Sequence, residues 1–205
     1  MTSIHSITFD VPDTAAADDF YATAFGTGAH VLTRAAQAPT TGFRGYLMSL
    51  VVSQPSTVDS LFDTALQGGA TTLKPPAKSF WGYSGVLRDP YGALWKIATS
   101  EKKDTGPATR DIDDIVLLLG VDDVAATKRF YVERGLPVTR SFGRKYVEFA
   151  TAPVTLALYS RRAAAKEAGV PIEGTGSHRL TIDADTDAFI DPDGFTWEDT
   201  HRSTR

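Results

Sequence analysis

Apolar and polar residues alternate along residues 4–11, and this period of two predicts a half-buried strand at the start of the chain. The period then lengthens to that of a helix, with Phe20 and Tyr21 on one apolar face and Asp13 or Thr14 as the N-cap. A strand followed closely by an amphipathic helix predicts a mixed α+β fold.

The rest of the first hundred residues is also predicted to contain both a helix and strands. Helical spacing predicts a second helix at residues 57–67, with Ser56 or Thr57 as its N-cap, and the small polar residues 35–42 predict a loop. Further strands are predicted at residues 29–33, 46–53, 71–74, 83–88 and 94–98.

A polar stretch with Gly106-Pro107, residues 101–111, predicts a solvated linker that extends to Asp114. After it, strands are predicted at 112–119, 137–142, 145–150, 154–159 and 178–184. A helix with Asp122 or Asp123 as its N-cap is predicted to run through Tyr131 and Arg134, and residues 161–168 are predicted to form a short helix or turn. The predicted domains are therefore residues 1–100, with a shortened first module, and residues 112–205, with a shortened last module.

Two pairs of motifs recur between these two parts. Asp89-Pro90-Tyr91-Gly92 and Asp191-Pro192-Asp193-Gly194 each predict a type I turn, and each leads into a short strand that carries Trp95 or Trp197. Phe20-Tyr21 and Phe130-Tyr131 each close a predicted helix. The chain is therefore predicted to hold an internal repeat, with both tryptophans in the core.

These motifs give the chain a resemblance to the vicinal oxygen chelate superfamily, which includes glyoxalase, bleomycin-resistance and extradiol dioxygenase proteins. The resemblance rests on the strand-helix-Phe-Tyr segments at 7–21 and 117–131, on residues 80–92 and on the two tryptophan strands. It implies tandem βαβββ modules that form two abbreviated, cup-shaped halves. It also implies that an enzyme of this kind would bind one divalent metal ion in the cup.

Composition narrows the classes of partner. The chain has 205 residues, a net charge of −4 and interspersed charges, which argues against nucleic acid as a partner. It has no cysteine, so thiolate metal sites and cysteine nucleophiles are excluded. No apolar run is long enough to cross a membrane, and no signal peptide is evident, so a cytoplasmic protein is expected, with a homodimer left open.

The positions implied for metal ligands carry few acceptor groups. The first-strand positions fall on Ser6 and Val116, and the last-strand position of the first part falls on Lys96, whose ammonium group only donates hydrogen bonds. The main hypothesis is therefore that no metal is bound. The alternative is one divalent ion held by His178 and Glu198, with Glu148 as a third ligand, while His30 and His201 are interpreted as surface residues.

Aromatic and cationic side chains suggest a different site. Aromatic residues near the predicted cup rim can stack on a planar ligand, and cationic or hydroxyl groups can orient it. The candidate ligand-binding residues are Phe80, Trp81, Tyr83, Arg88, Lys96, Thr8 and Ser49.

Two functions of different classes follow. The first is metal-free binding or sequestration of a small apolar or aromatic molecule in the first part of the chain. The second is a metal-dependent lyase, isomerase or dioxygenase that uses His178 and Glu198. The number of available ligands favours the first, and the sequence leaves open whether the protein is an enzyme.

Overall fold

The computed structural model describes residues 3–200, so His201 lies outside the described residues. The helices are α1 (Thr14–Ala24), α2 (Pro55–Gln67), α3 (Val124–Glu133) and α4 (Arg161–Ala168). The strands are β1 (Ile4–Val11), β2 (Val31–Ala35), β3 (Thr40–Gly42), β4 (Tyr46–Val51), β5 (Thr71–Ser79), β6 (Gly82–Arg88), β7 (Leu94–Thr99), β8 (Asp114–Val121), β9 (Val138–Ser141), β10 (Tyr146–Phe149), β11 (Val154–Ser160), β12 (Gly174–Gly176), β13 (Leu180–Ala184), β14 (Phe189–Ile190) and β15 (Thr196–Asp199).

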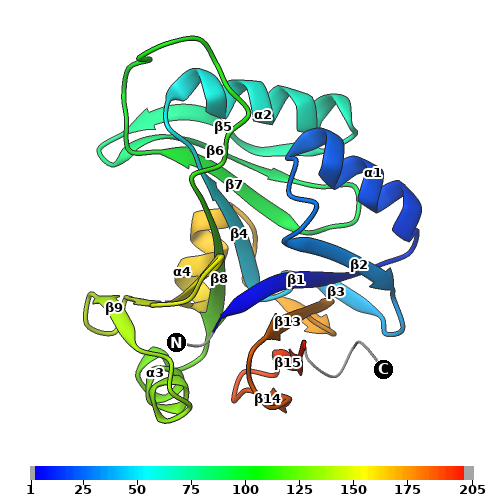
Figure 1. Ribbon diagram of the computed structural model, residues 1–205, viewed down its shortest axis with the longest axis vertical. Helices are drawn as coiled ribbons and strands as arrows, with labels where there is room; N and C mark the ends of the chain where they lie inside the picture. The colour runs from blue at the N-terminus through cyan, green and yellow to red at the C-terminus, as the bar shows by residue number, and fades with distance from the viewer. Residues whose placement is uncertain (1–2, 201–205) are drawn as a thin grey trace.

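Eight strands form the larger sheet, in the order β5-β6-β7-β4-β8-β11-β10-β9 (Figure 1). It consists of two complete βαβββ modules, β4-α2-β5-β6-β7 and β8-α3-β9-β10-β11. In each module the first and last strands pair in parallel, and the two modules join through the antiparallel pair β4 and β8, where Ser49 lies opposite Val116. This sheet forms the larger cup of the molecule.

Five strands form the smaller sheet, in the order β14-β15-β13-β1-β2. It combines the segment β1-α1-β2 with the last three strands, so both contributing modules lack strands that the larger sheet keeps. Each sheet thus takes strands from both sides of residues 101–111. The division into domains 1–100 and 112–205 remains a prediction.

The two repeated motifs meet through matching hydrogen bonds. The Tyr21 hydroxyl donates to Asp89 Oδ2 at 2.8 Å, and the Tyr131 hydroxyl donates to Asp191 Oδ2 at 2.5 Å. The other oxygen of each aspartate accepts backbone N–H groups of its own turn. Burial raises the pKa of both aspartates, and these hydrogen bonds offset part of that rise. Each bond therefore ties a helix end to the turn before a tryptophan strand.

Trp95 and Trp197 are fully buried, which confirms that both belong to the core. Trp95 Nε1 donates to Asp89 Oδ2 at 2.9 Å. Trp197 Nε1 makes no close hydrogen bond among the described residues, although it lies near enough to the Tyr131 hydroxyl to oppose the rise in the pKa of that group. The two strands therefore share a position in the repeat but differ in hydrogen bonding.

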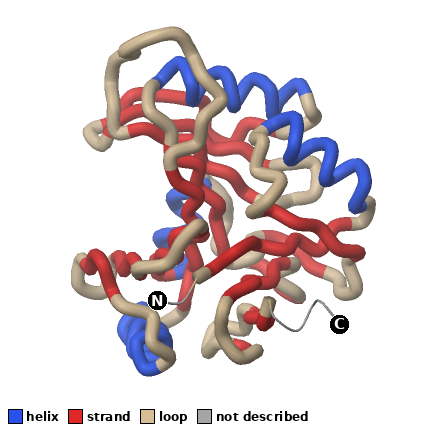
Figure 2. The backbone as a smooth tube through the Cα atoms, in the orientation of Figure 1, coloured by secondary structure: helices blue, strands red, loops and turns tan. Residues whose placement is uncertain are grey.

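Helix starts were predicted correctly at two of three sites. Asp13 and Asp123 cap α1 and α3 with their carboxylates. The predicted cap of α2 is wrong, because the N-cap is Gln54, which makes no side-chain cap. The Gln54 amide instead donates to the carbonyl oxygens of Gly106 and Pro107, so it fastens the long loop before β8 to the start of α2 (Figure 2).

The predicted loop at residues 35–42 also contains a short strand, since β3 pairs with β12 from the distant end of the chain. A glycine-rich segment can form such a pair because the backbone groups, not the side chains, make the contact. Within residues 3–200, the helices are too short or too polar to span a bilayer.

Candidate ligand-binding cup

The concave face of the larger sheet holds a cavity of about 500 Å³. Apolar, aromatic and charged side chains line it: Leu47, Ser49, Val51, Trp81, Lys96, Ala98, Thr99, Ser100, Asp114, Val116, Leu118, Arg140, Tyr146, Glu148, Tyr159 and Glu167. The size is that of a site for a small organic molecule.

The floor of the cavity is one row of side chains across three strands. Ser49 on β4 lies beside Lys96 on β7 and opposite Val116 on β8. The Lys96 ammonium group forms an ion pair with the Glu167 carboxylate from α4. The floor therefore offers one hydroxyl group and one cation that is already paired.

Aromatic rings form the walls. Tyr146 on β10 and Tyr159 on β11 contact each other edge to face, with ring centroids 5.3 Å apart. Trp81, in the turn between β5 and β6, lines the cavity from the opposite end of the strand order, and the residue is 84% exposed. Rings placed in this way can stack on a planar ligand without a large rearrangement.

Two carboxylates face the cavity on the side of β8 and β10. Asp114 lies where the predicted linker and the predicted strand at 112–119 overlap, and the structure places it in β8. Burial raises the pKa of its carboxyl group, while the Thr155 hydroxyl donates to it. Glu148 accepts from the hydroxyl groups of Tyr146 and Thr139. Neither forms an ion pair within residues 3–200. Arg140 on β9 lies opposite Glu148 and also lines the cavity, so this side carries charges of both signs.

A smaller cavity of about 230 Å³ adjoins the first one. Trp81, Lys96 and Glu167 line both cavities, and Tyr83 lines only the smaller one. The Tyr83 hydroxyl donates to Asp59 Oδ1 at 2.8 Å, and burial raises the pKa of Tyr83 to about 12. The Lys96–Glu167 pair therefore lies where the two spaces meet.

The structure brings four of the seven proposed ligand-binding residues to these two cavities: Ser49, Trp81, Tyr83 and Lys96. Phe80 is 81% exposed and lines neither cavity. Arg88 is exposed and lies beside a small surface pocket with Arg44. Thr8 lies on the smaller sheet, away from both.

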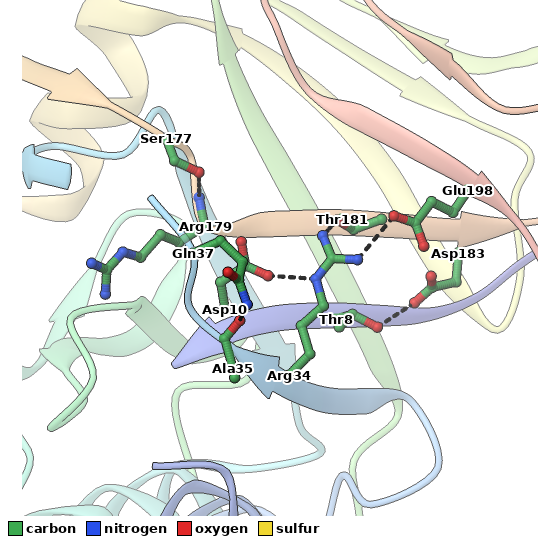
Figure 3. A network of polar contacts seen from close by, with 10 residues as sticks. All are labelled: Thr8, Asp10, Arg34, Ala35, Gln37, Ser177, Arg179, Thr181, Asp183 and Glu198. Carbon is green, nitrogen blue, oxygen red and sulfur yellow. Dashed lines mark hydrogen bonds and ion pairs between the residues drawn. The ribbon is translucent and has the colours of Figure 1, made fainter. Parts of the chain in front are cut away.

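Thr8 belongs to a network on the smaller sheet (Figure 3), where its hydroxyl donates to Asp183 Oδ2 at 2.7 Å. At the centre of that network, Arg34 donates to Asp10, to Glu198 at 2.9 Å and to Thr181. Glu198 therefore already neutralises a guanidinium group.

The residues proposed for a metal are spread over the molecule. His178 has its Nδ1 atom 2.5 Å from the Arg44 carbonyl oxygen and its Nε2 atom 3.0 Å from the Asp193 carbonyl oxygen, so a metal at either nitrogen would replace a hydrogen bond. Glu198 pairs with Arg34, and Glu148 lies in the other sheet. Residues 3–200 contain no group of three or more metal-binding side chains.

The larger cup does not fit a divalent ion either. Its central row carries Lys96, Ser49 and Val116, and an ammonium group repels a cation that a carboxylate or imidazole would bind.

Sequence reasoning missed several cavity residues, among them Asp114, Arg140, Tyr146, Tyr159 and Glu167. The two tyrosines lie on strands that the alternation predicted. The sequence did not show that these strands continue, through β8, the sheet that carries Ser49 and Lys96. Glu167 lies on α4, where Ala164, Ala165 and Ala168 make a buried face. That small-residue face is a sequence signal for close packing, although it does not identify the surface it packs on.

Comparison with known proteins gives structural matches only. No protein-family model and no curated protein matches the sequence. Glyoxalase I from Zea mays superposes with a TM-score of 0.61 at 13% identity, covering 96% of this chain and 91% of that one. A Bacillus subtilis protein assigned as a dioxygenase superposes with a TM-score of 0.57 at 14% identity, covering 95% and 83%. The resemblance and the α+β fold of paired βαβββ modules are therefore confirmed at the level of the fold.

Proposed function

From a fold shared with glyoxalase I and a cup of this composition, we propose that the protein binds and sequesters a small, planar aromatic molecule without a metal ion. The observation that carries the proposal is the 500 Å³ cavity, which is walled by aromatic rings and floored by Ser49 and Lys96. A concave, partly apolar space with a few convergent polar groups is typical of a small-molecule site.

Two features support binding in this cup over the metal-dependent alternative. The floor carries a lysine where a metal ligand would be needed, and His178 and Glu198 are both engaged elsewhere. Tyr146 and Tyr159 are held by neighbours, Tyr146 through its hydrogen bond to Glu148 and Tyr159 through its ring contact with Tyr146. Walls that are held before a ligand arrives lose less freedom on binding.

The test is calorimetric titration of chelator-treated protein with 2-naphthoate and with its uncharged amide, 2-naphthamide. Ser49→Phe places a ring on the cavity floor and should abolish binding of both compounds. Ser53→Phe is the matched control, because Ser53 is exposed just beyond β4 and lines no part of the cavity. Binding that survives Ser49→Phe, or that is absent until a divalent metal is added, would refute the proposal.

A further inference from the structure

Helix α4 lies on the concave face of the larger sheet. The other face of this sheet packs on α2 and α3, whereas α4 contacts β8, β11, β4 and β7 from inside the cup (Figure 1). Ala164, Ala165 and Ala168 are buried in one cluster with the inward side chains of Leu47 and Leu118. The helix therefore fills the apolar end of the cup and leaves the 500 Å³ cavity at the other end.

Two lysines hold the C-terminal end of α4. Lys74 Nζ donates to the carbonyl oxygens of Lys166 and Glu167, both at 2.7 Å, and Lys96 pairs with the Glu167 carboxylate. Lys74 and Lys96 lie in one row of the sheet, on either side of Val86. The last carbonyl groups of a helix carry partial negative charge, so the end of α4 presents carbonyl oxygens and a carboxylate to two cations. These groups of α4 therefore contact Lys74 and Lys96 in the way that the anionic group of a bound ligand would.

The Lys96–Glu167 pair is accessible from the cavity. The Lys96 side chain is 25% exposed and that of Glu167 is 36% exposed, and both line the cavity and its smaller neighbour. A partly exposed ion pair contributes little net stability, because water solvates each charge when the pair separates. A second carboxylate that arrives from the cavity can therefore replace Glu167 at small cost.

We infer that Glu167 is an internal competitor for Lys96, and that the ligand of the cup is an aromatic carboxylate whose anionic group takes the place of the Glu167 side chain. The inference rests on the proposed function and adds the chemical class of the ligand. A neutral aromatic molecule leaves the ion pair in place, whereas a carboxylate gains a charge-assisted contact with the ammonium group.

The experiment compares 2-naphthoate with 2-naphthamide by calorimetry in the wild-type protein, four single variants and one double variant. Glu167→Gln removes the competitor and should tighten binding of 2-naphthoate about threefold or more, with no change for 2-naphthamide. Lys96→Met should weaken 2-naphthoate about tenfold or more and leave 2-naphthamide unchanged. Lys166→Met and Glu133→Gln are matched controls, because both residues are exposed and outside the cavity.

The double variant Lys96→Met/Glu167→Gln keeps α4 packed without either charge and should bind the two compounds equally. If Glu167→Gln leaves or lowers the affinity for 2-naphthoate, or if wild-type protein binds the amide as tightly as the acid, the inference is overturned while the proposed function stands. If wild-type protein binds neither compound, the proposed function itself fails.

Discussion

The two buried tryptophans make different hydrogen bonds, and this difference predicts unequal responses to the same substitution. Trp95 and Trp197 are both fully buried, but only Trp95 donates to a carboxylate, that of Asp89. Replacing either by Phe removes the pyrrole part of the indole and leaves a comparable space. In Trp95→Phe the substitution also removes one donor from a buried carboxylate.

A hydrogen bond to a charged group contributes about 1.5–3 kcal/mol. Trp95→Phe should therefore lower the free energy of unfolding by about that much more than Trp197→Phe does. Truncation to Ala should cost about 3–5 kcal/mol at either site, and more at Trp95 than at Trp197. Trp81→Ala should cost far less, because its side chain is 84% exposed.

Urea unfolding followed by far-ultraviolet circular dichroism measures these differences, with a constant m-value as the check that the transitions are comparable. Tyr21→Phe is a second test, since it removes another donor from Asp89 and leaves the ring in place. Equal costs for the two Trp→Phe variants would refute the assigned role of the Asp89 hydrogen bond. A cost for Trp81→Ala as large as that for Trp95→Ala would remove Trp81 from the cavity rim.

Other measurements check the remaining parts of the account. If the native state binds no metal, as proposed, chelator should leave the melting temperature unchanged. A melting temperature that chelator lowers and zinc restores would support the metal-dependent alternative. Burial raises the pKa of Asp89, so its contribution to stability is present below an unfolded pKa of about 4 and is lost as the pH rises through the folded pKa. Asp89→Asn should therefore reduce the loss of stability as the pH rises from about 4 in urea titrations; an unchanged slope would contradict this. The quencher 4-nitrobenzoate should reduce tryptophan fluorescence, and Trp81→Phe should remove most of that response; an unchanged response would place the ligand elsewhere.

Local patterns predicted the elements that depend on local contacts. Alternation located β1, and the Asp-Pro-x-Gly turns located the tryptophan strands, because these signals lie within a few residues of one another. The capping carboxylates of Asp13 and Asp123 were found for the same reason. The repeat also identified Tyr21 and Tyr131, although not their hydrogen bonds to the two turns.

Local patterns could not predict how strands from the first part of the chain pair with strands from the second part. Pairing of β4 with β8 depends on contacts between residues about seventy positions apart, and no local pattern records them. The same holds for α4, whose sequence predicts a helix but not that it enters the cup and brings Glu167 to Lys96. Thr8 was grouped with Ser49 and Lys96 because the site was sought within one part of the chain, whereas the sheets combine both parts.

The most direct test of metal-free binding in the larger cup is a crystal structure of the chelator-treated protein with 6-bromo-2-naphthoate, with the bromine located by anomalous scattering. The account predicts bromine density inside the 500 Å³ cavity, between Trp81 and Tyr146, with the carboxylate on Lys96 and no metal ion beside it. Bromine density beside His178 and Asp193, or ligand density that appears only after a divalent metal is added, would contradict it.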